Sequence, residues 1–587
     1  MYLRVTKRRN ADGSGARYFQ LAENTWDAAR GCSVANVLYS FGRADDSKIE
    51  GLRRLAASIL RVVPADARID PAMAPDVRLR DAWPYGGVYV LEALWKELGI
   101  DKMLGQILRM KRVRQPFAAA IFAMVANRAY VPGSKLACWE QWLREEVFLP
   151  GAHALDLHHL YGAMDFLQDH KEEIEKEVYF STADLMNADV DLVFYDTTSL
   201  HFEVDEEDTA TLERRGRKYA PLRKRGYSKN GRGDAPQIVI GLAVTRDGLP
   251  VRSWVFMGNT ADVTTIEQVK ADLRGWRLGR CVFVGDAGMN SEDNRRTLSL
   301  GAGKYILACK MRGGGEVDEE VLTRAGRYHD VKDNLRVKEV FVGDGERRKR
   351  YVVCHNPEEE KRQQAHRAKV LEEVEAELKT MQPSKAKGGR PTKRAMEIVM
   401  SGRYGRYVRM LKGGKLVVDR GAITEAARYD GKWVVTSNDD TLTAEDLALG
   451  YKQLLRVEAC WRTMKSGLRT RPVFHFRPWR IQAHVTICVL ALLLERVAEI
   501  RTGDTWRNVL RELNTLKVVE YDRAGVRVRQ TTEPRPEVSA LLKKLGVVAP
   551  PRFHAVEQVA EAAEGEPNGE ASATPPGHDG PASGPSS

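Results

Sequence analysis

The 587-residue chain contains only seven cysteines, and these form no Cys-x-x-Cys pair and no cluster with histidine. We therefore expect no zinc site, and unpaired thiols in an odd number suit a reducing cytosol. Long apolar runs are also lacking. The longest, Val485–Leu494, is too short to span a bilayer, and Met1–Arg9 is charged with no apolar segment after it. These absences predict a cytoplasmic protein with no secretory signal and no membrane anchor.

Basic residues outnumber acidic residues over most of the chain. The formal net charge is +12, although the residues from Ala555 onward include six acids and neither lysine nor arginine, so the remainder is more basic still. A basic body suggests a polyanionic partner such as nucleic acid. Charge alone is equally consistent with a role in solubility.

The length implies several domains, because one hydrophobic core rarely serves so many residues. Composition shifts and Pro/Gly-rich stretches divide the chain into seven regions. We expect a strand-and-helix region (1–80), a helical region that could bind DNA ends (81–185), a first core part (186–312), an insertion (313–432), a second core part (433–502), a helix–hairpin–helix piece (503–554) and a disordered acidic tail (555–587).

Region 186–312 reads as strands followed by alternating helices and strands. The β-rich runs are 190–195, 237–244, 251–256, 281–285 and 305–309, with a helix predicted over 265–276 and another over 290–300. Three strands in succession and then an alternating pattern predict an α/β fold of the ribonuclease-H type.

Two of these strands each deliver one aspartate. Asp196 and Asp286 both come directly after an apolar run, and open α/β sheets place their sites at the carboxyl ends of strands. Each aspartate alone is equally well explained as a turn cap. Together they predict converging carboxylates, which are suitable ligands for a divalent cation.

A third carboxylate lies on a predicted helix, Thr443–Ser466. Tyr451, Glu458 and Lys465 are spaced seven residues apart, so a regular helix would place them in one stripe, and Arg462 falls on the same stripe. A solvated face with a Glu–Arg pair is the alternative.

These stretches carry a family resemblance. The segments YDTTSLHFE (195–203), GNTAD (258–262), VGDAGMNS (284–291), YILACK (305–310) and RPVFHFRPWRIQAH (471–484), with Tyr451…Glu458…Lys465, resemble the DDE transposases of bacterial insertion sequences. Within that class the chain is similar to the insertion-sequence-four superfamily, which has a Tyr-Arg-Glu-Lys signature. One position differs, because Leu454 stands where the signature has arginine.

The resemblance implies a ribonuclease-H-like core in which Asp196, Asp286 and Glu458 are catalytic and bind two Mg²⁺ ions, with Mn²⁺ as a substitute. Glu458 follows Asp286 by 172 residues, which fits the insertion that this superfamily carries. The implied activity is cleavage at the element's terminal inverted repeats by metal-dependent hydrolysis, followed by joining of the 3′-OH ends to target DNA.

The resemblance also implies partners and binding residues. Tyr451 and Lys465 would hold DNA phosphates, and we infer that Arg462 supplies the cation missing at Leu454. Double-stranded DNA is the expected partner, bound by a homodimer in a synaptic complex within a bacterial cytoplasm, associated with the nucleoid. The basic stretch 214–232 could track phosphates or be a solvated loop, and the loop 385–394 is more simply a flexible basic segment.

Two other functions share these features. One is a domesticated or inactive relative that binds or nicks DNA without integrating it. The other is a nucleic-acid-binding structural protein whose acids are fortuitous. Three intact carboxylates argue against both.

Overall fold

The computed structural model describes residues 1–9, 15–27, 32–44, 46–62, 77–186, 191–229, 231–276, 281–313, 315–332, 334–381, 391–523 and 525–558. The chain divides into two compact units. The smaller consists of Met1–Asp81, Glu520–Arg529 and Ala555–Ser587, and the larger consists of Ala82–Val519 and Gln530–His554.

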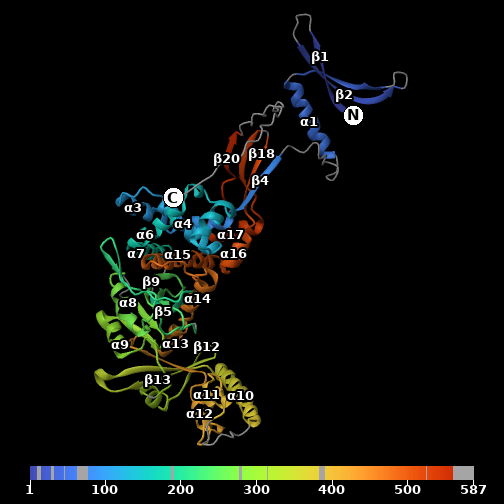
Figure 1. Ribbon diagram of the computed structural model, residues 1–587. Coiled ribbons are helices and arrows are strands. Elements are labelled where there is room, and N and C mark those ends of the chain that lie inside the picture. Colours follow the sequence, from blue (N-terminus) through green and yellow to red (C-terminus); the bar gives the residue numbers. More distant parts are fainter. Residues whose placement is uncertain are drawn as a thin grey trace, which may run out of the picture. The chain divides into compact units, whose positions relative to one another are not determined.

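A nine-stranded sheet forms the centre of the larger unit (Figure 1), in the order β12-β13-β14-β17-β11-β10-β5-β8-β9. Strands β5, β8 and β9 are antiparallel neighbours, while β10 and β11 run parallel to β5. The predicted α/β class is confirmed. The strands are β5 (Leu192–His201), β8 (Gln237–Val244), β9 (Pro250–Met257), β10 (Val282–Gly285), β11 (Lys304–Ala308), β12 (His329–Lys332), β13 (Leu335–Val342), β14 (Lys349–His355) and β17 (Lys432–Ser437).

Strand β5 is buried on both faces. Leu192 and Phe194 belong to the largest hydrophobic core, whereas Val193 and Tyr195 belong to a second core. Because successive side chains of a strand point to opposite faces, each core covers one side of the sheet. Helices α13 (Ala444–Lys452), α14 (Leu455–Arg462) and α15 (Pro478–Thr502) contribute to the first core, and α8 (Ile266–Asp272) and α9 (Glu292–Ser299) to the second.

All five strands predicted between residues 190 and 309 are present, but Asp196 does not end its strand. β5 continues to His201, because Thr197–Leu200 pair with Ile238–Gly241 of β8. The β-branched Thr197 and Thr198 suit an extended strand. The prediction that Asp196 stands at a strand end is therefore wrong.

The residues between β11 and β17 both extend the sheet and build a separate small core. Strands β12, β13 and β14 continue the central sheet, and β17 pairs with β14 on one side and β11 on the other. The small core contains Val374, Ile398 and Leu416. The remaining elements here are η7 (Val317–Val321), η8 (Gly345–Arg347), α10 (Pro357–Thr380), α11 (Lys393–Met400), η9 (Gly405–Tyr407), β15 (Val408–Met410), β16 (Leu416–Val418) and α12 (Arg420–Ala427).

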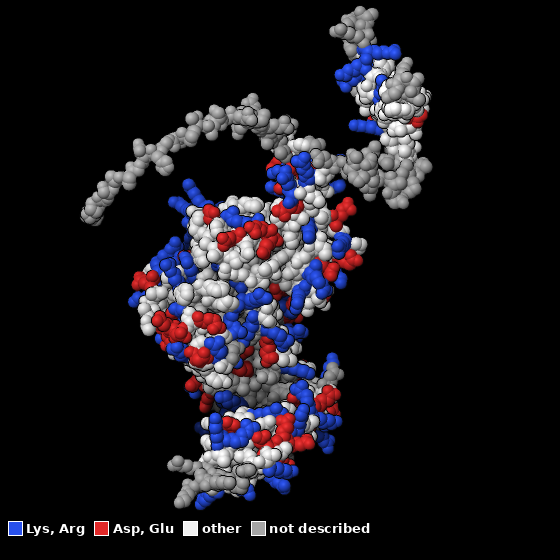
Figure 2. Space-filling view, turned by 45° about the vertical axis from the view of Figure 1, so that its right-hand side comes forward, with Lys and Arg blue, Asp and Glu red and all other residues white. Residues whose placement is uncertain are grey.

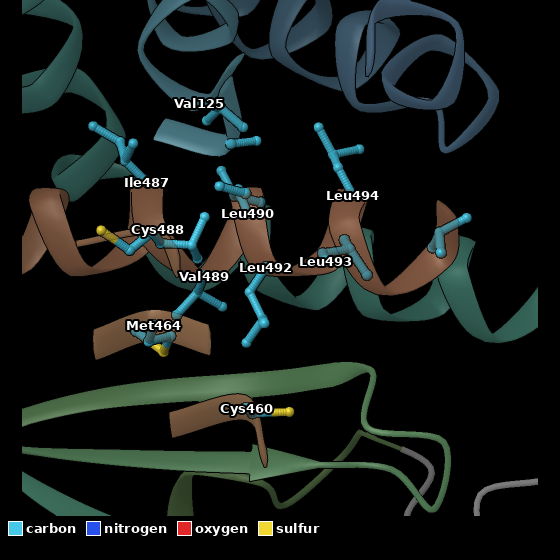
Figure 3. Packing of buried hydrophobic residues seen from close by; sticks show 14 of the residues in the cluster. Val125, Cys460, Met464, Ile487, Cys488, Val489, Leu490, Leu492, Leu493 and Leu494 are labelled. Carbon is cyan, nitrogen blue, oxygen red and sulfur yellow. The ribbon is translucent and has the colours of Figure 1, made fainter. Parts of the chain in front are cut away.

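Helix α15 packs between the helical layer and the segment that contains Met464. Leu490 points toward Val125 of α4, whereas Val489 and Leu492 point toward Met464 (Figure 3). The helical layer consists of α2 (Gly86–Glu97), α3 (Ile100–Met110), α4 (Phe117–Tyr130), α5 (Lys135–Ala137), the π-helix η3 (Cys138–Glu146), η4 (Ala152–Ala154), α6 (Leu157–Asp169) and α7 (Lys171–Leu185). The apolar periodicity of His158–Val178 favours a single helix, but the structure has two, because the backbone of His170 leaves the helical region. Helix α3 was not predicted.

Helix α15 has 25 residues and, by length and composition alone, could cross a membrane. However, 89% of its most apolar window is buried inside the protein. The apolar run Val485–Leu494 is thus the middle of a longer helix. Its apolar composition is explained by burial in the protein, because a helix that is hydrophobic on all sides can be a core helix.

The smaller unit contains an antiparallel sheet of β1 (Tyr2–Arg9), β2 (Gly15–Asp27) and β3 (Cys32–Arg43), followed by α1 (Asp46–Val62). The third strand was not predicted. The proline- and charge-rich composition of residues 64–80 is typical of a linker, but residues from Val77 onward form strand β4 (Val77–Pro84).

The C-terminal order of helix, hairpin and helix is confirmed by α16 (Trp506–Leu513), β18 (Lys517–Arg523), β19 (Val526–Thr531) and α17 (Pro536–Leu545). Residues 555–558, expected to be disordered, instead belong to β20 (Phe553–Gln558), which pairs beside β19. Pairing satisfies their backbone groups despite the lack of a buried face. The rest of the acidic tail, from residue 559, lies outside the described residues.

Replacing Leu492 with alanine tests the role of α15. Leu492 is completely buried, so we expect the free energy of unfolding to fall by about 2–5 kcal/mol. Urea unfolding followed by tryptophan fluorescence measures this. Ile500→Ala, on the same helix but 37% exposed, is the control and should cost less than half as much. Equal losses would contradict a core role for α15.

Candidate active site

Asp196 and Asp286 lie on the same face of the central sheet. The parallel pairing of β5 with β10 ends at Phe194 and Val284, and each aspartate follows two residues later. Phe194 and Val284 both belong to the first core, so alternation places both aspartates on the face covered by α13 and α14. Both carboxylates are half-buried.

Helix α14 brings Glu458 to this face. The indole Nε1 of Trp461 donates a hydrogen bond to a carboxylate oxygen of Asp196 over 3.1 Å, and Glu458 lies one turn earlier on the same helix. Val457, Cys460 and Met464 are buried beneath the helix, whereas Glu458 is exposed. The apolar side of α14 thus fixes the helix on the sheet and leaves Glu458 on the open side.

Tyr451 lies among the three predicted carboxylates. Burial raises the pKa of its phenol, and the charges of Asp286, Glu458 and Asp196 each raise this pKa further. Helix α13 reaches the sheet closely because the preceding residue is Gly450, where a Cβ atom would come within 3.2 Å of Ile306. The phenol is therefore neutral at ordinary pH and can donate a hydrogen bond.

The segment Thr443–Ser466 is not the regular helix that the sequence predicted. It comprises α13, α14 and a π-helical turn, η10 (Thr463–Gly467). Between α13 and α14 the amide of Leu454 donates to the carbonyl of Tyr451, a tightened i→i+3 bond. The rotation per residue therefore departs from the ~100° of a regular α-helix, and the four residues do not form the stripe predicted for one. Tyr451 and Lys465 are half-buried, while Glu458 and Arg462 are exposed.

Two features of this segment differ from the predicted stripe. Glu458 and Arg462 form no ion pair with each other in the part of the chain that the structure describes. Leu454, at the signature's arginine position, is only 7% exposed and packs in the first core. A cation at position 454 would have to be buried here, which explains why leucine is stable at this position.

Lys229 and Asp262 also reach the site, although the sequence favoured only a place in a basic stretch for Lys229 and a turn before a helix for Asp262. The Lys229 ammonium lies 2.9 Å from Asp262 and 3.9 Å from Asp196, and it donates to the carbonyl and hydroxyl of Thr197. The Thr197 hydroxyl donates to Asp262. A Cβ atom at Gly288 would meet the carboxylates of both Asp286 and Asp262 within 3.5 Å.

Burial disfavours the charged form of both aspartates, and Lys229 is the cation that opposes this effect. It raises the pKa of Asp196 to about 6, with Lys229 opposing the shift and Asp286 adding to it. The pKa of Asp286 is raised for the same reasons, with Asp262 as the neighbouring acid. Burial and Arg471 lower the pKa of Lys465, which the Asp196 charge opposes.

Carboxylate oxygens that lack counter-charge fit a hard divalent cation such as Mg²⁺ or Mn²⁺. Among the described residues, only Asp156, His158 and His159 place three potential ligand atoms within 4.8 Å of one another, so the three predicted ligands are more widely spaced. Both ring nitrogens of His159 already have hydrogen-bond partners, the Asp156 amide and Gln115. The aspartates at the sheet are thus better suited to a metal by their chemistry.

Three other titratable side chains near the core, His475, His484 and Glu203, make contacts of their own. His475 and His484 are buried, and burial lowers the pKa of His475 to about 3, so both rings are neutral parts of the interior. Glu203 is exposed and lies 3.1 Å from His201. Most of the loop 385–394 lies outside the described residues.

The basic stretch 214–232 is partly neutralised. It contains a small hairpin, β6 (Leu212–Arg214) and β7 (Arg217–Tyr219), in which Arg214 pairs with Asp169. Arg223 pairs with Asp208 and the exposed Arg215 also pairs with Asp169, whereas Lys218 is exposed. Figure 2 likewise shows Lys and Arg mixed with Asp and Glu on the visible face of the larger unit, with no continuous basic stripe.

Residues 200–494 match the sequence family described as "Transposase DDE domain". This range includes Asp286 and Glu458 and begins four residues after Asp196. A search of curated proteins finds no match. Among solved structures, the chain is similar to the cryo-EM structure of the piggyBac transposase synaptic complex with hairpin DNA, with 10% identity, a TM-score of 0.32, and coverage of 74% of this chain and 82% of that one. The family assignment rests on the sequence match.

Replacing Asp196 with asparagine tests the burial of its charge in metal-free protein. A carboxylate whose folded pKa is raised costs stability as pH rises through about 4 to 6. Asparagine removes this cost, so we expect the variant's gain in unfolding free energy to be about 1–2 kcal/mol larger at pH 8 than at pH 4.5. Urea unfolding in EDTA measures both values. An effect of equal size at the two pH values would contradict the raised pKa.

Proposed function

Because this chain belongs to the transposase DDE domain family, we propose that Asp196, Asp286 and Glu458 are the catalytic carboxylates of a DNA transposase. The chain is an enzyme that cleaves DNA ends by metal-dependent hydrolysis and joins their 3′-OH ends to target DNA. The observation that carries the residue assignment is the position of Asp196 and Asp286 on one sheet face, beneath the helix that bears Glu458.

We propose that the core is ribonuclease-H-like. Its support is the order β9-β8-β5-β10-β11, with three antiparallel strands followed by two that run parallel to the first. This order places β5 at the centre, next to β10, so that the two strands carrying aspartates are neighbours. We also propose that residues 81–185 form a separate helical region and that residues 313–432 form an insertion into the core.

Asp196, Asp286 and Glu458 would hold the divalent ions, which we propose to be Mg²⁺. Bound ions of this kind supply Lewis acidity and a nucleophile at neutral pH for phosphodiester cleavage. Trp461 orients the Asp196 carboxylate by its hydrogen bond, and the Gly288 amide does the same for Asp286 over 3.0 Å. The Lys229 ammonium offsets part of the negative charge between Asp196 and Asp262.

Tyr451, Arg462 and Lys465 are proposed to contact DNA phosphates. The Tyr451 phenol is neutral and lies near the carboxylates of Asp286, Glu458 and Asp196, so it can donate a hydrogen bond to a phosphate there. Arg462 is exposed on α14, the helix that also carries Glu458. A cation on the exposed side of α14 is favoured over position 454, because Leu454 is buried.

The biological setting is also a proposal. A bacterial insertion sequence of the insertion-sequence-four superfamily would supply terminal inverted repeats as substrate, and a homodimer would synapse the two ends in the cytoplasm near the nucleoid. Its support is the resemblance of the signature segments.

Alanine at Asp196, Asp286 or Glu458 should abolish end cleavage while leaving end binding intact, because each change removes a carboxylate without removing a DNA contact. Release of a labelled end in Mg²⁺ and gel-shift binding in EDTA measure the two properties. Full cleavage by any one variant would overturn its assignment. Strand-transfer products from the unmodified protein distinguish a transposase from a nuclease that only cuts.

Mg²⁺ should stabilise the unmodified protein at pH 8, by about 1.4 kcal/mol at ten times its Kd. The gain should be lost in Asp286→Asn, since a proposed ligand is gone, and kept in Glu358→Gln, which alters an exposed acid on α10. Thermal unfolding with and without Mg²⁺ measures the effect. An equal gain in Asp286→Asn would exclude this residue from the metal site.

A further inference from the structure

Two phenylalanine side chains lie on the protein surface just after the catalytic helix. Phe474 is 60% exposed and Phe476 is 63% exposed. They belong to the segment 468–477, which connects η10 to α15 and has no regular secondary structure. A large apolar ring in water is unfavourable, so two neighbouring exposed rings require an explanation.

The local backbone explains why both rings share one side. His475, between them, is only 8% exposed, and its ring contacts those of Tyr161 and His484 in the interior. In an extended segment alternate side chains point the same way. Burial of His475 therefore directs Phe474 and Phe476 outward together.

The segment is held firmly at its start. The buried Arg128 guanidinium donates to the carbonyls of Leu468 and Arg469 over 3.2 and 3.0 Å, and the ring of His484 bonds the carbonyl of Thr470 over 3.0 Å. These bonds fix the backbone before the rings, which lowers the entropy lost when a ligand binds.

One ring is also supported from the side. The Arg223 guanidinium lies 5.1 Å from the centroid of Phe476 and 5.8 Å from that of the buried Phe202. Asp208 holds Arg223 in place through a hydrogen bond of 2.8 Å to its Nε. Phe476 is thus fixed by an anchored cation while most of its surface stays open.

The segment that carries the pair is rich in arginine, although Asp165 pairs with one of these arginines, Arg480. Between Ser466 and Arg480 the chain has arginines at positions 469, 471, 477 and 480 and no acid. The Arg471 guanidinium lies 2.9 Å from the ring of His201, the last residue of the strand that carries Asp196. A DNA strand bound at Asp196 would therefore pass near the two rings.

We propose that Phe474 and Phe476 form a stacking platform for unpaired bases of the DNA strand at the active site, with Arg471 and Arg477 on its phosphates. Aromatic rings flanked by arginines suit single-stranded nucleic acid, since any base can stack on them. Bases inside a duplex are already stacked and cannot reach the rings. This inference rests on the proposed function, because it concerns the same DNA strand.

Fluorescence of 2-aminopurine tests the platform, because stacking quenches it. The probes are a DNA duplex with a four-base single-stranded extension containing 2-aminopurine and the same duplex without an extension. Measurements in EDTA with the full chain prevent cleavage. The protein should quench the extension's fluorescence, and Phe474→Ala and Phe476→Ala should each weaken binding to the extended probe by about 5- to 50-fold. Affinity for the plain duplex should change less than about threefold.

Two further variants sharpen the result. Phe476→Trp retains an aromatic ring and should restore quenching, whereas Met400→Ala removes a 79% exposed side chain from α11 and should leave both probes unaffected. Equal affinity of the Phe474→Ala/Phe476→Ala double variant for the extended probe would overturn the platform. So would a change in oligomeric state by light scattering with unchanged quenching, since the rings would then form a protein contact.

The two proposals fail separately. If the unmodified protein does not cleave element ends in Mg²⁺, the catalytic assignment fails, whereas quenching in EDTA still reports on the platform. If cleavage occurs and quenching is absent, the catalytic assignment stands and the platform is refuted.

Discussion

Burial of β5 on both faces is the constraint on which the site depends. Leu192 and Phe194 belong to one core, and Val193 and Tyr195 to the other, so a shift of one residue would exchange every side chain between the two cores. This fixed register places Asp196 on the side of α14, where the Trp461 indole can reach its carboxylate. Since packing sets the position of the acid, the site retains a carboxylate whose pKa burial raises to about 6.

The sequence contained enough information to predict the five strands between residues 190 and 309, because apolar runs such as Val282–Gly285 are local signals of buried strands. It did not predict that β5 continues past Asp196, since this depends on pairing with β8, more than thirty residues away. The break between α13 and α14 was hidden for a similar reason. Leu454 is buried in the core at this break, and the spacing of apolar residues along the sequence does not reveal such a tertiary contact.

Lys229 and Asp262 show a second limit of sequence reasoning. The first is one of many cations in a basic stretch, and the second ends the GNTAD segment, where a turn before a helix explains it locally. Only the fold brings both within ion-pair distance, beside Asp196. The GNTAD resemblance was the one available signal for Asp262. The electrostatics of the site thus depend on residues from three separated segments, so altering one carboxylate changes the pKa of the others.

Strand β17 joins the inserted strands to the rest of the sheet, because it pairs with β11 on one side and with β14 on the other. Thr436 of β17 pairs with Leu307 and with Tyr351. On the ribosome this has a consequence for timing. Asp196 and Asp286 leave the exit tunnel early, but Glu458 follows Asp286 by 172 residues, about 10–30 s of synthesis at typical rates. β17 can be paired on both sides only after β14 has been made. A nascent chain therefore lacks the third proposed carboxylate until residue 458 of 587 has been translated, and α15, which contributes to the main core, is made later still.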